Sequence, residues 1–139
     1  MNANSLKALE FDRIRTLLLQ QAGSVEGKAR LEALQPRTEP AAVREALART
    51  SEGVALLRVV GRQPYHDLPD PAEALAGARV RGAHLEPRAL ADLASFIEGG
   101  VEIARRVAGV DGTPRLSRLA AGVQDTGDVA AAIRRALLP

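Results

Sequence analysis

Apolar residues recur at every third or fourth position along most of the chain, the spacing that places side chains on one face of an α-helix. No useful length of sequence alternates apolar and polar residues as a β-strand does. The predicted helices cover 11–22, 25–35, 40–60, 71–80 and 87–108, and a helical turn is predicted over 3–9 in front of them. Two shorter helices follow, one with Leu116, Leu119 and Val123 and a last one with Val129, Ile133 and Leu137. We expect an all-α fold: an antiparallel assembly of five to seven helices in a single domain, 1–139.

Short polar residues and proline mark the starts of several helices. Ser24 is the predicted N-cap of 25–35, Thr38 that of 40–60, and Asp70 with Pro71 opens 71–80. The stretch 61–70 contains three helix breakers and no periodicity, so it is predicted to be the longest loop.

Two helices are predicted to form the core by packing against each other. The seam of 40–60 has spacings of four, three, four and three, through Val43, Leu47, Thr50, Val54 and Leu57. The stripe of 87–108 contains Leu90, Leu93, Ile97, Val101, Ala104 and Ala108 and passes through Gly99–Gly100. This glycine pair costs about 2 kcal/mol of helix propensity relative to alanine, so it marks a bend or a close helix crossing. We therefore expect Leu57 and Ile97 to be buried.

Composition adds limits on class and location. The 139 residues include 26 alanines, 19 leucines and three aromatic residues, which suits one helical core. The absence of cysteine excludes disulfides, and no apolar run is long enough for a membrane span, so we expect a soluble, cytoplasmic protein. The net charge is only +2, although residues 101–139 carry six arginines against four acidic residues.

Motifs for catalysis are weak throughout the chain. Residues 23–29 imitate a phosphate-binding loop, but the spacing is short, Lys28 is followed by alanine, and no strand precedes the glycine. His66 and His84 stand far apart, and Glu98 with Glu102, one helical turn apart, fit a solvated helix face better than a metal or acid–base pair. We predict no catalytic, cofactor-binding or metal-ligating residue.

Two aromatic residues are candidate contacts to nucleic-acid bases. Phe96, two residues before Glu98, resembles the Phe-x-Glu wedge of mismatch-repair proteins, but its mid-helix position favours packing. Tyr65 lies in the long loop, where an anchoring role against the helices is favoured over stacking on a base.

A nucleic-acid contact, if the chain makes one, is predicted to use the arginines of the C-terminal third. Guanidinium groups suit phosphate oxygens, and the candidates form three pairs, Arg105 and Arg106, Arg115 and Arg118, and Arg134 and Arg135. The alternative is that these arginines form ion pairs with Glu102, Asp125, Asp128 and neighbouring carboxylates.

The ordered series of short motifs resembles the N-terminal region of the second bacterial MutS family. It begins with Leu-Glu-Phe-Asp-Arg-Ile at 9–14, Gly-Lys at 27–28, Leu-Gln-Pro at 34–36 and Thr-Ser-Glu at 50–52. It continues with Asp-Leu at 67–68, Pro-Ala-Glu-Ala-Leu at 71–75 and the segment from 82 to 85. The sequence departs from the family at Gly82–Ala83, where a glycine pair is frequent.

The resemblance implies that the chain is a fragment of a much longer protein, which also fits the last helix ending at Pro139 without a cap or tail. The parent would be a DNA-binding ATPase, using ATP and Mg²⁺, and an endonuclease, acting in suppression of homologous recombination and rescue of collided ribosomes. This chain would be a scaffold without catalytic residues. Its partners would be the rest of the parent chain and, through the parent, DNA or the ribosome, but no membrane; homodimer formation stays open. The alternative is a free-standing helical adaptor that binds a partner protein.

Overall fold

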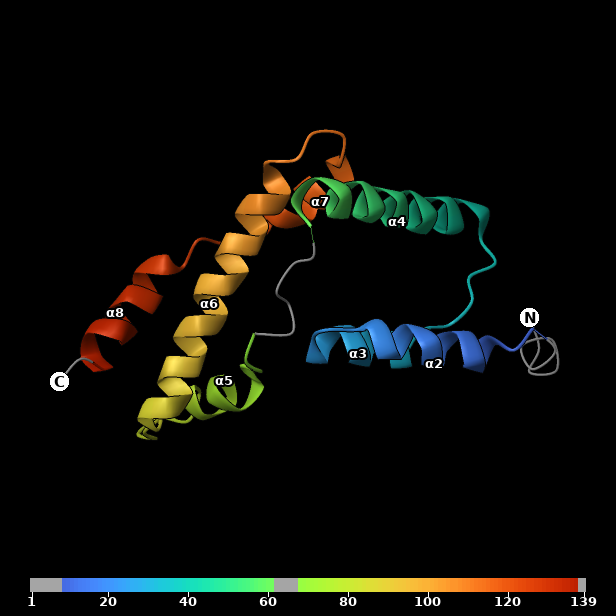
Figure 1. The fold of residues 1–139 in the computed structure, drawn as a ribbon. Coiled ribbons are helices and arrows are strands. Elements are labelled where there is room, and N and C mark those ends of the chain that lie inside the picture. The colour runs from blue at the N-terminus through green and yellow to red at the C-terminus, as the bar shows by residue number, and fades with distance from the viewer. Residues whose placement is uncertain (1–8, 62–67, 138–139) are drawn as a thin grey trace. The chain divides into compact units, whose positions relative to one another are not determined.

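The computed structural model describes residues 9–61 and 68–137, and that part of the chain contains seven helices and no strand (Figure 1). The helices are α2 (Phe11–Gln21), α3 (Val25–Glu32), α4 (Pro40–Val60), α5 (Ala72–Ala78), α6 (Pro87–Ala108), α7 (Pro114–Ala121) and α8 (Gly127–Leu137). The all-α prediction is confirmed, and the helix bounds lie within a few residues of those predicted. Most of the turn predicted at 3–9 and of the loop predicted at 61–70, with Tyr65 and His66, lies outside the described residues.

The chain divides into two compact units, one containing the described residues up to Ser51 and the other those from Glu52 onward. Each unit is described separately below. This division does not test the expectation of a single domain over 1–139, which stays a prediction.

Two of the predicted helix starts are confirmed. The hydroxyl oxygen of Ser24 accepts a hydrogen bond from the N–H of Gly27 at 3.0 Å, so Ser24 caps α3. The carboxylate of Asp70 accepts one from the N–H of Ala72 at 2.9 Å, at the first residue of α5. Both bonds satisfy N–H groups that have no acceptor inside their own helix.

The predicted cap of α4 is wrong, because Glu39 rather than Thr38 accepts the free N–H groups. Its carboxylate binds the N–H of Ala41 at 3.0 Å and that of Ala42 at 2.6 Å. The hydrogen bond from Ala41, followed by the one from Ala42, holds the pKa of Glu39 below its ordinary value. Each oxygen of the carboxylate accepts one of the two N–H groups, and the negative charge strengthens both hydrogen bonds.

In the first unit, α2 and α3 contact each other without enclosing a buried side chain. Arg15 connects them by donating to the backbone oxygen of Glu32 at 3.5 Å, and its guanidinium lies 5.9 Å from the centre of the Phe11 ring. Large apolar side chains of α2 remain exposed, among them Ile14 and Leu17.

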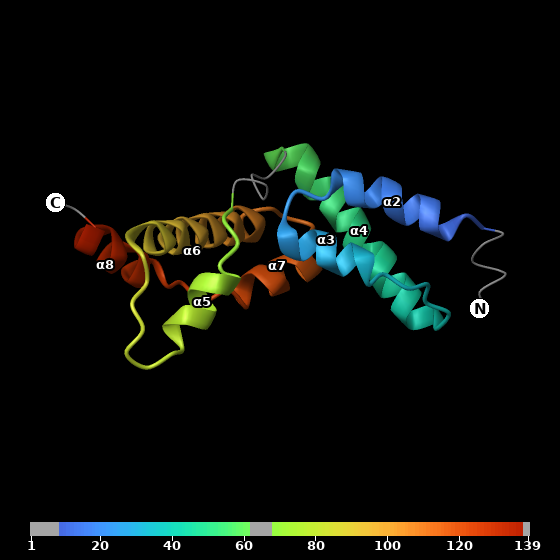
Figure 2. The ribbon, with the colours of Figure 1, turned by 90° about the horizontal axis from the view of Figure 1, so that it is seen from below.

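In the second unit, α6 is the helix that the others contact. α8 runs back along α6, α7 packs near the C-terminal end of α6, and α5 contacts α6 as well (Figures 1 and 2). The buried core consists of Leu56 from α4, Ile103 and Val107 from α6, and Val110 just after α6. The partly buried side chains of Val60, Leu68, Leu116 and Ala120 pack against it.

The buried face of α4 differs from the predicted seam. Leu57 is 51% exposed and Leu47 is 61% exposed, whereas Leu56 is only 6% exposed. The buried residues of α4 are Glu52 and Leu56, which lie one helical turn apart on another face. Within the second unit, α4 therefore packs on α6 through Leu56, whereas the seam residues Val54 and Leu57 are exposed.

The predicted stripe of α6 is only partly correct. The buried residues of this helix are Ala94, Ile103 and Val107; Ile97 is half-buried and Ala108 is exposed. Because α5, α7 and α8 all contact α6, its covered surface is wider than one stripe.

The two glycines inside α6 have different surroundings. A Cβ atom on Gly99 would overlap the side chain of Leu68, which packs against the core, whereas a Cβ on Gly100 would meet nothing within 4 Å. Gly99 thus permits the close approach of a residue that precedes α5, and not the helix crossing that is one of the two predicted reasons for the glycine pair.

The substitution Leu56→Ala is expected to lower the free energy of unfolding by about 2–5 kcal/mol, because it removes a buried side chain and leaves a cavity. The neighbouring substitution Leu57→Ala should change it by about 0.5 kcal/mol or less, since that side chain is exposed. Urea denaturation followed by circular dichroism measures both. Equal losses in the two variants would show that the buried face of α4 has been misidentified.

The glycine pair provides a second matched comparison. Gly100→Ala should raise the free energy of unfolding by up to about 1 kcal/mol, because alanine favours the helix and has room there. Gly99→Ala should gain less or lose stability, because its methyl group displaces Leu68. The same denaturation experiment tests this order, and an equal gain in both variants would contradict it.

Candidate nucleic-acid interface

The six arginines predicted to contact nucleic acid lie on three helices of the second unit, two each on α6, α7 and α8. Arg105 and Arg106 share one carboxylate, that of Glu102. Arg106 Nε donates to it at 2.9 Å and Arg105 Nη1 at 3.1 Å. The hydrogen bond from Arg106, with the charges of both arginines, holds the pKa of Glu102 below its ordinary value. The predicted ion pairing with Glu102 is therefore present.

Arg134 joins α8 to α6 through a two-pronged ion pair with Glu98. Its Nε and Nη2 atoms donate to the two Glu98 oxygens at 3.2 and 2.8 Å, and Nη2 also donates to the hydroxyl of Ser95 at 2.9 Å. This hydrogen bonding lowers the pKa of Glu98 and raises that of Arg134. Glu98 and Glu102 thus bind different arginines and do not form a carboxylate pair.

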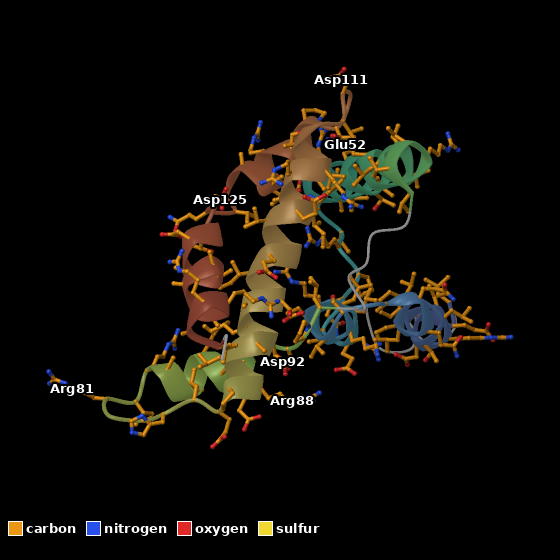
Figure 3. All side chains as sticks on the ribbon, turned by 60° about the vertical axis from the view of Figure 1, so that its left-hand side comes forward. Glu52, Arg81, Arg88, Asp92, Asp111 and Asp125 are labelled. Carbon is orange, nitrogen blue, oxygen red and sulfur yellow. The ribbon has the colours of Figure 1, made fainter. Side chains whose placement is uncertain are left out.

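Arg115 on α7 contacts the buried side chain of Glu52 on α4. Glu52 is labelled in Figure 3. Glu52 is only 7% exposed, and its carboxylate accepts three hydrogen bonds. The donors are the N–H of Arg115 at 2.8 Å, the N–H of Leu116 at 3.0 Å and the Arg115 guanidinium at 3.0 Å. We call this set the Glu52 clamp.

The Glu52 clamp replaces the cap that α7 would otherwise need. Thr113, the residue before α7, is 1% exposed and makes no capping bond, and its hydroxyl donates instead to the carbonyl of Val110 at 2.9 Å. Burial raises the pKa of Glu52, but the hydrogen bonds from Leu116 and Arg115 and the Arg115 charge outweigh it, so the pKa lies below its ordinary value. Glu52 is thus held as a carboxylate in its folded position.

The other two arginines, Arg118 and Arg135, are exposed and have no ion pair with any described residue. Asp125, one of the predicted partners, accepts instead from the N–H of Gly127 at 3.0 Å and so serves the start of α8. Four of the six arginines thus bind carboxylates within the unit, and Arg118 and Arg135 are the two of the six that do not.

Sequence reasoning missed Glu52 as an important residue. Its hydrogen-bond partners lie 63 and 64 residues away, so no local spacing points to them. Its only signal was its place in the Thr-Ser-Glu motif at 50–52.

Residues 23–29, whose sequence imitates a phosphate-binding loop, form the cap and first turn of α3 in the structure. The N–H of Gly27 donates to the Ser24 hydroxyl, and the N–H of Lys28 donates to the Ser24 carbonyl at 3.0 Å, within the first turn of α3. These N–H groups therefore already have acceptors and do not form a cradle for phosphate.

Two searches across the described residues bear on other site types. No three His, Cys, Asp or Glu side chains there lie close enough together to hold a metal ion. No helix among residues 9–61 and 68–137 is long and apolar enough to cross a bilayer. His84 lies beside a groove between α5 and α6 that is considered further below.

Comparison with known proteins finds no family model and no solved structure that matches the chain. It does find curated bacterial proteins named endonuclease MutS2. The one from Lacticaseibacillus casei BL23 is 36% identical over 98 residues, which is 70% of this chain and 12% of that protein. The one from Geobacillus sp. WCH70 is 34% identical over 74% of this chain and 13% of its own length. The one from Geobacillus kaustophilus HTA426 is 28% identical over 99% of this chain and 18% of its length.

The substitution Glu52→Gln is expected to destabilise the chain at neutral pH, because an amide cannot accept all three hydrogen bonds of the clamp. Since the pKa of Glu52 is lower in the folded state, the carboxylate stabilises the fold above the ordinary glutamate range and loses this effect as the pH falls through the folded value. The difference in melting temperature between wild type and variant should therefore be several degrees at pH 7 and vanish in strong acid.

Glu102→Gln is the matched control, because Glu102 also binds arginine but its side chain is 45% exposed. Its loss at pH 7 should be clearly smaller. Thermal denaturation from pH 7 to pH 3 measures both variants. A pH-independent loss in Glu52→Gln, or a loss no larger than the control's, would contradict the role of the clamp.

Proposed function

Because the chain is related in sequence to the MutS2 family, as its motifs predicted, we propose that it is the N-terminal, non-catalytic scaffold domain of a longer MutS2-type protein. In this proposal, the helical units brace the parts of the parent that move when nucleotide binds, so that closure of an ATPase is transmitted to the region that holds nucleic acid. The protein acts in the cytoplasm.

This proposal rests on the difference between the share of this chain that the similarity covers and the share of each relative that it covers. The similarity extends over 70–99% of this chain but only 12–18% of the relatives' length. The chain thus spans less than a fifth of the relatives it matches. Most of what a relative does as an endonuclease is therefore expected to reside outside these 139 residues.

The way the polar side chains are used supports a structural role. Glu52, Glu98 and Glu102 all accept hydrogen bonds from arginines of the same unit, and the first two connect different helices. A group used in this way holds helices in place and is not free to act as an acid, a base or a metal ligand.

The activities of the parent follow from the resemblance and the relatives' name. We propose that the parent is a DNA-binding ATPase and endonuclease with catalytic residues outside this chain, and that it acts in suppression of homologous recombination and rescue of collided ribosomes. The ATP, Mg²⁺ and nucleic-acid sites then belong to the remaining part of the parent.

Three proteins test the proposal: the full-length parent, residues 1–139 alone, and the parent lacking residues 1–139. Residues 1–139 should neither hydrolyse ATP nor cleave DNA. The truncated parent should retain ATP hydrolysis but lose the effect of ATP on its affinity for DNA, if the domain transmits closure. ATP hydrolysis or saturable ATP binding by residues 1–139, abolished by Lys28→Ala, would refute the non-catalytic assignment.

We further propose that nucleic-acid contact by this domain depends on Arg118 and Arg135. For the two phosphate contacts of these arginines, log affinity for duplex DNA should fall against log salt with a slope of about −2, below the slope of about −3 expected if three to four contacts were made. Replacing both arginines by glutamate should remove most of this slope. Arg30→Glu with Arg37→Glu, which changes the net charge equally in the first unit, is the control. An unchanged slope in the Arg118 and Arg135 variant would remove these residues from the interface.

A further inference from the structure

A groove lies between α5 and the start of α6, with a cavity volume of about 470 Å³. Its apolar lining comes from Ala74 and Gly77 on α5, from Ala89 and Leu93 on α6, and from Leu85 in the connection between the two helices. Leu85 packs so closely on Gly77 that a Cβ there would lie 2.9 Å from its methyl group. Small residues on both helices thus keep the groove open between them.

The groove carries a negative charge, although the chain as a whole has a net charge of +2. Four carboxylates line it, those of Asp70, Glu73, Glu86 and Asp92, against a single arginine, Arg88. Arg88 is 92% exposed and approaches Asp92 only to 4.0 Å, so it neutralises little of this charge (Figure 3). The local excess of three carboxylates repels phosphate and favours cations.

The carboxylates come from both sides of the groove, Asp70 and Glu73 from the start of α5 and Glu86 and Asp92 from the start of α6. No three metal-ligating side chains gather anywhere in the described part of the chain, this groove included. Spaced carboxylates around an apolar floor match spaced cations on an apolar body better than a single metal ion. Lysine and arginine side chains have this character, since their aliphatic stems pack on apolar surface and keep the charged end at the rim.

We propose that the α5–α6 groove binds a basic amphipathic segment of a separate partner protein. Apolar side chains of that segment lie on the floor formed by Ala74, Ala89 and Leu93, and its lysines or arginines pair with Glu73 and Asp92 at the rim. This contact gives the chain an adaptor role that does not depend on the proposed scaffold function. The proposal is tested by peptide binding, so its outcome is measured separately from any ATPase or nuclease activity.

The test uses residues 1–139 and two fluorescein-labelled peptides of equal length. The first contains lysine, alanine and leucine, with leucine at every third or fourth position, and the second has glutamate in place of every lysine. Fluorescence anisotropy should show saturable binding of the lysine peptide, weakened by added salt, and no binding of the glutamate peptide. Backbone NMR shift changes on adding the lysine peptide should concentrate in α5, the connection and the first turns of α6.

Charge and shape variants then locate the binding. Glu73→Gln combined with Asp92→Asn should weaken the lysine peptide about fivefold, as expected for the loss of two exposed ion pairs. Glu26→Gln combined with Glu32→Gln, which removes the same charge from α3, should leave binding unchanged. Ala89→Arg places a guanidinium in the groove and should abolish binding. Thermal melting followed by circular dichroism checks that each variant is folded. If Ala89→Arg does not fold, Ala89→Lys takes its place.

Several results would overturn the proposal. Equal weakening in the groove variant and the α3 control would mean that only overall charge matters. NMR shift changes concentrated outside α5, the connection and the first turns of α6 would place the peptide elsewhere. Concentration-dependent self-association that is lost in Ala89→Arg would show that a second copy of the chain, and not a partner protein, occupies the groove.

Discussion

The way α4 and α7 are held together in the second unit depends on the hydrogen bonds that the Glu52 carboxylate accepts. This carboxylate is buried, and it satisfies the first N–H groups of α7 as well as the guanidinium of Arg115. Those N–H groups have no acceptor within α7, and the nearby Thr113 side chain does not cap the helix. Leu56, one helical turn further along α4, enters the core beside Ile103 and Val107. A polar and an apolar contact therefore fix the part of α4 from Glu52 onward against α6 and α7.

The helices of this fold could be predicted from the sequence because their periodicity and end residues are local. Ser24 and Asp70 both mark helix starts where expected. The buried face of α4 could not be predicted, because the regular spacing of Val54 and Leu57 describes the more apolar face and takes no account of where α7 lies. Glu52, counted as polar, is buried because of a partner 63 residues away.

The candidate interface shows the same division between local and distant information. The helices that carry the arginines were predictable, as was the local pairing of Arg105 and Arg106 with Glu102. The pairing of Arg134 with Glu98, 36 residues apart, and that of Arg115 with Glu52 depend on packing between helices. The acidic groove also escaped prediction, because it combines residues before α5 with residues of α6. The order of short motifs, by contrast, led to the MutS2 relatives without structural information.

The role of Glu52 is tested most directly by NMR titration of the amide protons of Arg115 and Leu116. A proton donated to a carboxylate shifts when that carboxylate is protonated. Both amide resonances should therefore move together as the pH falls, with one midpoint below the ordinary glutamate range of about 4.3. The same midpoint should appear for the side-chain carboxyl carbon of Glu52. Amide resonances that do not change through this range, or a Glu52 midpoint at or above the ordinary value, would contradict the account.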